Sequence, residues 1–241
     1  MIDWFYEWFD SKYYHILYKN RDEEEAENFL KNLSKLEFFK KDSKIIDIAC
    51  GKGRHSLFLS ELGYDVIGID LSKNSIKHAK QFEKENLNFD VADMRKIYKE
   101  NTFDIALNLF TSFGYFQNKE DDLSVIKSMS ENLKDDGILI IDFLNCKKVI
   151  SNLIKTETKE INGVQFNISR KVEDNFIIKN IEVNHDDEKI YFQEKVKALT
   201  KDNFSELLTF AGLQIINTFG NYKLDEFNYQ TSDRLIIIAE K

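Results

Sequence analysis

The chain has 241 residues, with 34 Lys and Arg against 42 Asp and Glu, a formal net charge of −8, two cysteines and no proline. This length suits one α/β domain with room for an insertion. The acidic balance disfavours broad binding to nucleic acid or to an anionic membrane surface. The cysteines are too few for a disulfide framework, no window is apolar enough to cross a bilayer, and the first residues lack the features of a secretion signal. We therefore expect a cytoplasmic protein.

The first 40 residues are predicted to be helical. Phe5, Trp8 and Phe9 recur at three- and four-residue spacing, and the same spacing continues through Tyr13 and Leu17. A second helix is expected over residues 23–36, where apolar positions again fall on one face.

Apolar strands then alternate with amphipathic helices. Strands are expected at 45–49, 65–69, 88–92, 103–109 and 138–143. Helices are expected at 54–62, 72–85 and 121–133. This alternation indicates a parallel sheet that is covered by helices on both faces.

The pattern changes after Asn145. A short helix is expected to residue 154, and residues 157–199 are typical of three antiparallel strands joined by polar turns. We interpret this segment as an insert against one end of the main sheet. A helix is then expected from Thr200 to Gly212, followed by strands at 213–219 and 235–239.

A glycine turn follows the first strand and a carboxylate ends the second. The turn reads Asp47-Ile-Ala-Cys-Gly-Lys-Gly53, and the second strand ends at Asp70. A dinucleotide fingerprint needs a third glycine, which is missing here, and no phosphate-binding Gly-Lys-Ser/Thr loop is present. The turn therefore suits a nucleoside cofactor without a pyrophosphate. In the simpler alternative, the glycines only turn the chain and Asp70 only caps the next helix.

Four motifs in order resemble those of class I S-adenosylmethionine-dependent methyltransferases. They are Asp47 to Gly53, the strand-end Asp70, the segment 90–94 and the strand 103–110, and Gly137 to Asp142 resembles the fifth strand of that family. The resemblance implies a single methyltransferase domain over residues 1–241. The implied fold is a Rossmann-like, doubly wound, seven-stranded sheet, mostly parallel with the last strand antiparallel.

The resemblance also implies a cofactor, S-adenosyl-L-methionine, and its product S-adenosyl-L-homocysteine. Asp70 would accept hydrogen bonds from the ribose hydroxyls, Asp93 would pair with the adenine amino group, and Leu71 and Met94 would sandwich the ring. Arg54 is a candidate for the cofactor carboxylate, or else a surface residue. The full set of expected cofactor-binding residues is Tyr14, Ala49, Gly51, Gly53, Arg54, Asp70, Leu71, Ser72, Asp93, Met94, Leu109, Phe110 and Ser112.

The acceptor is expected to be a small molecule methylated on nitrogen or oxygen. Methyl transfer to an amine needs alignment more than a base, so no catalytic residue is assigned, and His55, Tyr14 and Tyr115 are only candidates. Neither Cys50 nor Cys146 lies in a metal-ligand pattern, and no metal is expected. The alternatives are an RNA or protein methyltransferase and a non-catalytic protein that binds the cofactor or its product.

Three segments carry two interpretations each. Residues 1–40 form either a helical lid, to which Tyr13, Tyr14 and Tyr18 would belong, or a helix buried on the sheet, which we favour for Phe5, Trp8 and Phe9. Residues 110–116 form either an aromatic wall of the acceptor pocket or the buried face of a helical turn. The 157–199 insert either covers the acceptor pocket or forms the interface of a homodimer.

Overall fold

The computed structural model describes residues 4–19, 23–186 and 188–241. Its main sheet has seven strands in the order β10-β11-β5-β4-β1-β2-β3. β11 is antiparallel to both of its neighbours, whereas β1 to β5 pair in parallel. The predicted doubly wound fold is therefore confirmed. The strands are β1 (Lys44–Ile48), β2 (Asp65–Asp70), β3 (Leu87–Val91), β4 (Phe103–Asn108), β5 (Leu133–Leu144), β10 (Gln214–Phe219) and β11 (Arg234–Glu240).

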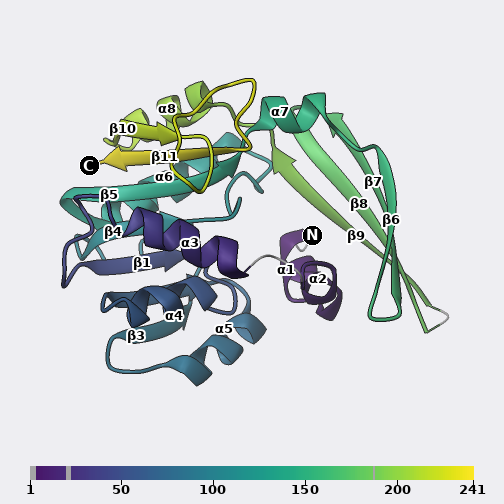
Figure 1. Ribbon diagram of the computed structural model, residues 1–241, viewed down its shortest axis with the longest axis horizontal. Helices are drawn as coiled ribbons and strands as arrows, with labels where there is room; N and C mark the ends of the chain where they lie inside the picture. The colour runs from purple at the N-terminus through teal and green to yellow at the C-terminus, as the bar shows by residue number, and fades with distance from the viewer. Residues whose placement is uncertain (1–3, 20–22, 187) are drawn as a thin grey trace.

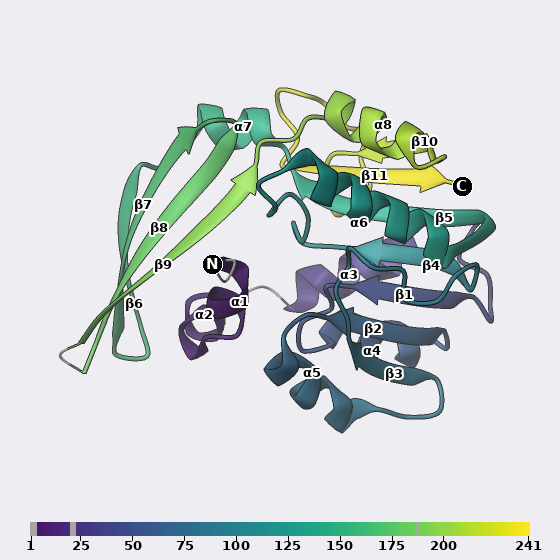
Figure 2. The ribbon, with the colours of Figure 1, turned by 180° about the vertical axis from the view of Figure 1, so that it is seen from behind.

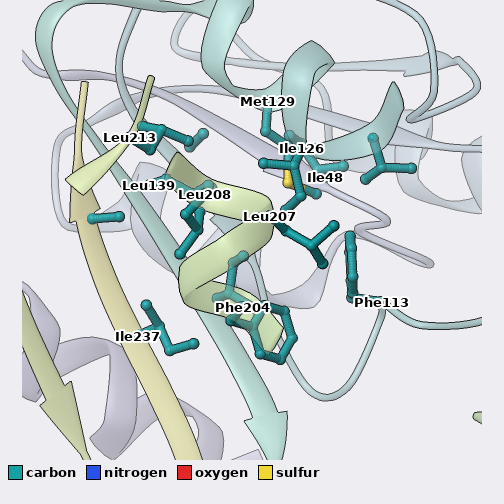
Figure 3. Packing of buried hydrophobic residues seen from close by; sticks show 14 of the residues in the cluster. Ile48, Phe113, Ile126, Met129, Leu139, Phe204, Leu207, Leu208, Leu213 and Ile237 are labelled. Carbon is teal, nitrogen blue, oxygen red and sulfur yellow. The ribbon is translucent and has the colours of Figure 1, made fainter. Parts of the chain in front are cut away.

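Helices cover both faces of this sheet (Figures 1 and 2). One face packs against α3 (Glu23–Leu33), α4 (Arg54–Glu61) and α5 (Lys73–Ala79), and its core includes Phe29 and Leu59. The other face packs against α6 (Lys119–Asn132) and α8 (Lys201–Phe210). Figure 3 shows the second core, in which side chains from the two helices meet residues of the sheet such as Ile48 and Ile237.

The insert is a separate four-stranded antiparallel sheet in the order β6-β7-β8-β9, which follows the short helix α7 (Cys146–Ser151). Its strands are β6 (Thr156–Ile161), β7 (Val164–Glu173), β8 (Phe176–His185) and β9 (Glu188–Lys197). The prediction of three strands missed one, because β6 is an edge strand of mostly polar, exposed residues without a repeating apolar face.

Two short N-terminal helices, α1 (Trp4–Phe9) and α2 (Lys12–Leu17), lie between the insert sheet and the main domain (Figures 1 and 2). Trp8 and Tyr13 are buried there against Phe166 and Ile168 of the insert. Tyr13, expected in a lid, is thus a core residue with 6% exposure, since its ring packs on the strands rather than toward the cofactor turn. Phe5 and Trp8 are buried as expected, although Trp8 packs on the insert and not on the main sheet.

Several element boundaries differ from those expected. α5 ends at Ala79 and gives way to a single 3₁₀ turn, Lys80–Phe82, so the helix expected to residue 85 is shorter. α6 begins at Lys119, where Asn118 caps it, and β5 begins at Leu133. Residues 110–116 are not helical; Phe113 and Phe116 are buried, whereas Phe110 is half-buried. No helix in the described ranges is long and apolar enough to span a membrane.

Candidate functional site

A cavity of about 610 Å³ opens at the carboxyl ends of the parallel strands. β1 lies between β2 and β4, so the strand order reverses at this point. Ligands of open α/β sheets bind at such a reversal. The cavity extends from the turn after β1 to α1, α2 and the inner face of the insert sheet, whose residues also line it.

The turn after β1 has a left-handed backbone. Ala49, Gly51 and Gly53 have φ values of 62°, 58° and 81°. A Cβ on Gly53 would lie 2.5 Å from the ring of Phe89, so only glycine fits there. The position of the missing third glycine is Ser56, which is buried and donates a 2.6 Å hydrogen bond to Asp47. In a dinucleotide-binding fold, the glycine at this position lets the helix pack closely on the strand. Here the Ser56 side chain occupies that space.

Asp70 presents a half-buried carboxylate at the end of β2, where it lines the cavity. One oxygen accepts from the Gly51 backbone N–H and the other from the Ser72 N–H, each at 2.8 Å. Burial raises the pKa of Asp70, and these backbone hydrogen bonds oppose that rise. Each carboxylate oxygen can accept more than one hydrogen bond, so both oxygens retain capacity for ligand hydroxyls.

The residues expected to contact adenine follow β2 and β3. Leu71 and Met94 line the cavity and pack against the core that holds α6. Asp93 also lines it, but Arg95 donates to both of its carboxylate oxygens, with a shortest distance of 2.6 Å. These hydrogen bonds contribute to the lowered pKa of Asp93, against the opposing effect of burial. Arg95 thus holds Asp93 ionised and oriented beside the cavity.

The loop after β4 is held in an unusual conformation. Phe110 and Thr111 have φ values of 56° and 63°, which is strained for a β-branched residue such as Thr111. The Phe110 N–H donates to the carboxylate of Asp142 at 2.9 Å, and the Thr111 N–H donates to the Asp142 carbonyl at 2.9 Å. Arg234 donates to Asp142 at 2.8 Å and to the Thr111 hydroxyl at 2.9 Å, and the Tyr222 hydroxyl donates to Asp142 at 3.2 Å.

The candidate catalytic residues line the same cavity. His55 stacks on Phe110, with ring centroids 4.6 Å apart and planes within 9°, and it accepts from Arg54 at 3.0 Å. Arg54 also lies over the Phe110 ring. The Tyr115 hydroxyl donates to the carbonyl of Thr111 in the loop after β4. Tyr14 packs edge-on against Phe9 of the N-terminal helices.

Of the residues expected to bind the cofactor, all except Gly53 and Ser72 line the cavity. Gly53 lies under the turn, and Ser72 caps α5 while its hydroxyl donates to Asp10 of the N-terminal segment at 2.5 Å. Other lining residues were not expected from the sequence. They include Trp4, Lys19, Thr111, Arg170, Lys179 and Glu194. Arg170, Lys179 and Glu194 could have been noticed in the sequence, because each is a charged residue that interrupts the alternation of apolar residues along its strand.

His15 of α2 is the lining histidine whose environment is most altered. Burial, together with the nearby Lys52 charge, lowers its pKa to about 4. The ring is therefore neutral at neutral pH. Within the described part of the chain, no group of three or more His, Cys, Asp or Glu residues is arranged to hold a metal ion.

The sheet order and the position of the cavity are those of a Rossmann-like α/β protein of the class I methyltransferase type. A family model described as a methyltransferase domain matches residues 39–212, and the chain belongs to this methyltransferase family. The resemblance seen in the motifs is confirmed.

Two curated relatives illustrate the extent of the similarity. A putative methyltransferase of Bacillus subtilis, YqeM, is 35% identical over 109 residues, which are 44% of this chain and 44% of that protein. The glycine/sarcosine N-methyltransferase of Aphanothece halophytica is 26% identical over 229 residues, covering 92% of this chain and 83% of that protein. The chain thus aligns with less than half the length of the first of these proteins.

A solved structure shares the whole architecture. The S-adenosylmethionine-dependent methyltransferase from Clostridium acetobutylicum superposes with a TM-score of 0.79, at 17% sequence identity and with 95% of each chain covered. At this identity the likeness establishes the fold alone, including the seven-stranded sheet and the attached antiparallel unit.

Proposed function

We propose that the protein transfers the methyl group of S-adenosyl-L-methionine to a nitrogen or oxygen atom of a small-molecule acceptor. The observation that carries the proposal is the continuity of one cavity. Its sheet end presents the glycine turn and the Asp70 carboxylate, and its other end is enclosed by α1, α2 and the insert. Two ligands could therefore meet inside one site without crossing bulk solvent.

The residues at the sheet end fit an adenosyl cofactor. Asp70 has acceptor capacity for two ribose hydroxyls, the backbone at Gly51 allows close approach, and Leu71 and Met94 offer apolar contacts to a flat base. When bound, the cofactor would supply an electrophilic methyl carbon on a sulfonium. The protein's own residues would bind the cofactor and the acceptor, orient them toward each other and exclude water. This is sufficient for an acceptor that is already nucleophilic.

The whole cavity holds about 610 Å³, and its acceptor side is lined by the insert sheet and the N-terminal helices, which favours a small molecule over RNA or a folded protein. The net charge of −8 also opposes nucleic acid as a partner. The relative that aligns over 92% of the chain is named for methylating nitrogen in glycine and sarcosine. We include in the proposal a lid role for α1 and α2 and a reducing, cytoplasmic location, which suits the two free cysteines.

Thermal stabilisation by three ligands tests the cofactor. S-Adenosylmethionine and S-adenosylhomocysteine should each raise the melting temperature in a concentration-dependent way, because they bind the native state alone. NAD should not, since Ser56 occupies the third glycine position. A shift with NAD alone, or none with either adenosyl compound, would contradict the proposal. Binding of both without methyl transfer to any member of a broad amine and alcohol panel would instead favour a non-catalytic binding protein.

A further inference from the structure

The inner face of the insert sheet changes from apolar to charged where it reaches the cavity. On β7, Phe166 and Ile168 are buried against the N-terminal helices, and Arg170, the next residue on that face, lines the cavity. The same change occurs on the neighbouring strands β8 and β9, at Lys179 and at Glu194. Charged residues therefore begin where the apolar packing ends.

The strand register places these three side chains in one row. Arg170 is directly opposite Lys179, and Lys179 is directly opposite Glu194. Two cations that face each other across an antiparallel pair destabilise the sheet. Arg170 has a partner in Glu157, but that carboxylate is not among the residues that line the cavity. Lys179 likewise lies beside Glu194, so each cation has one carboxylate partner that reduces the repulsion, and an anionic ligand between the two cations would reduce it further.

The charge at this end of the cavity is positive overall. Arg170 and Lys179 from the insert and Lys19 from the N-terminal segment line it. Among the described lining residues contributed by the insert sheet and the N-terminal segment, Glu194 is the one carboxylate. This contrasts with a chain whose formal net charge is −8. In a low-dielectric cavity, an anion near such a cluster is attracted more strongly than it is in water.

Lys179 is held in place and retains donor capacity. Its ammonium donates to the Tyr18 hydroxyl at 2.5 Å and lies 3.5 Å from Glu194, while the Tyr18 hydroxyl donates to Glu194 at 2.6 Å. An ammonium group has three N–H donors, so these two described partners leave one donor for a ligand. Burial and the neighbouring Arg170 lower the pKa of Lys179, and Glu194 opposes this change.

We propose that Arg170 and Lys179 bind an anionic group, a carboxylate or a phosphate, of the methyl acceptor. The inference rests on the proposed function and narrows its substrate class to small anionic amines or alcohols. Arg170 has five N–H donors, of which one at Nη1 donates to the Ile154 carbonyl at 3.2 Å and one at Nη2 donates to Glu157, so donors remain for the anion. Lys179 supplies a point charge beside it. Ile177 and Val196 line the adjacent wall and would contact the carbon part of the acceptor.

Anion binding can be measured without knowing the acceptor. The full chain is saturated with S-adenosylhomocysteine, and the melting temperature is followed against sodium phosphate and sodium acetate, with sodium chloride at the same ionic strength as reference. We expect saturable stabilisation by phosphate or acetate beyond that by chloride, and the stronger of the two identifies the anionic group. The apparent Kd should rise at least tenfold in Lys179→Met and in Arg170→Gln.

Two further variants separate a ligand contact from a general loss of charge or structure. Lys171→Met removes an exposed cation next to Arg170 on the opposite face of β7, where Lys171 pairs with Glu173, and it should bind the anion like the wild type. Lys179→Met/Glu194→Gln removes the cation without leaving Glu194 unpaired, so it should fold and still lose anion binding.

Stabilisation no greater than that by chloride, or equal stabilisation of the wild type and the double variant, would overturn the inference. In either case, a rise in melting temperature with S-adenosylhomocysteine alone would leave the proposed function intact. Absence of that shift in the wild type would instead overturn the proposed function, on which the inference rests.

Discussion

The two ends of the cavity are built in different ways. The sheet end consists of backbone turns, short side chains and buried carboxylates, and Asp47 and Asp142 there are at most 1% exposed. The insert end consists of long side chains on the antiparallel sheet and of two helices of six residues each. A cofactor shared by many enzymes suits the first construction, whereas an acceptor that differs between enzymes suits the second.

The difference also concerns how each end is held. At the sheet end, strained loops are fixed by hydrogen bonds between residues far apart in the chain, such as Asp142 and Arg234. At the insert end, Tyr18, Lys179 and Glu194 form a small network that joins α2 to the sheet. The first end is thus held by buried carboxylates, and the second by a network of partly exposed side chains.

Breaking the Asp142–Arg234 pair should have the largest effect. Asp142 is fully buried, so Asp142→Ala leaves the half-buried Arg234 guanidinium without its carboxylate partner and frees the strained Phe110–Thr111 loop. Loss of one member of a buried ion pair costs about 3–5 kcal/mol. We expect the free energy of unfolding, measured by urea denaturation, to fall by about this amount.

The matched control is Lys171→Met in the exposed insert pair with Glu173, which should leave the urea midpoint unchanged. Equal midpoints for the Asp142→Ala variant and the wild type would mean that the buried network does not hold the loop. The contrast between the two ends would then lose its main support.

Removing the Asp70 carboxylate should have the next largest effect. Asp70→Ala deletes the acceptor that we assign to the ribose hydroxyls. Hydrogen bonds to a charged group contribute about 1.5–3 kcal/mol, so the Kd for S-adenosylhomocysteine should rise roughly 100-fold in calorimetry.

Asp65→Ala, at the other end of β2, provides the control for a general loss of charge in that strand. Its affinity should match that of the wild type. Unchanged affinity in Asp70→Ala would show that Asp70 serves only to hold Gly51 and Ser72.

The sequence predicted the sheet end far better than the insert end. The strands β1, β2, β4 and β5 are rich in apolar, mostly buried residues, and the glycine turn and Asp70 lie beside them in the local sequence. The Asp142 network joins residues 92 positions apart, so no local pattern could reveal it.

At the insert end the signals were weaker for physical reasons. β6 has the sequence TETKEI and is almost entirely exposed, so no burial imposes a pattern on it. Tyr13 and Tyr14 are adjacent and chemically identical, and only the placement of the insert decides which ring is buried. Arg170, Lys179 and Glu194 lie on three different strands, and the register that aligns them is a tertiary property.

The buried Asp47 should make stability depend on pH. Burial raises its pKa from 3.8 to about 6 in the folded protein. A raised folded-state pKa means that the contribution to stability is fully present below about pH 4 and is lost as the pH rises through about 6. At 1.36 kcal/mol per pKa unit, the loss is on the order of 2–3 kcal/mol.

Asp47→Asn cannot ionise and keeps a side chain that can accept from Ser56. Its free energy of unfolding relative to the wild type should therefore increase between pH 4 and pH 7, and the subtraction cancels titrations shared by both proteins. A difference that stays constant over this range would show that Asp47 titrates alike in the folded and unfolded states.

The smallest effect should separate the neighbours Tyr13 and Tyr14 at the insert end. Tyr13 is 6% exposed in the core beneath the insert, whereas Tyr14 is partly exposed and lines the cavity. Tyr14→Ala should weaken S-adenosylhomocysteine binding about fivefold, equivalent to about 1 kcal/mol, and leave the melting temperature of the ligand-free protein nearly unchanged. Tyr13→Ala should lower that melting temperature by several degrees, because it leaves a cavity in a packed core. If Tyr14→Ala instead destabilises the ligand-free protein as much as Tyr13→Ala does, α2 is a structural part of the insert core, and the lid role that we propose for it is wrong.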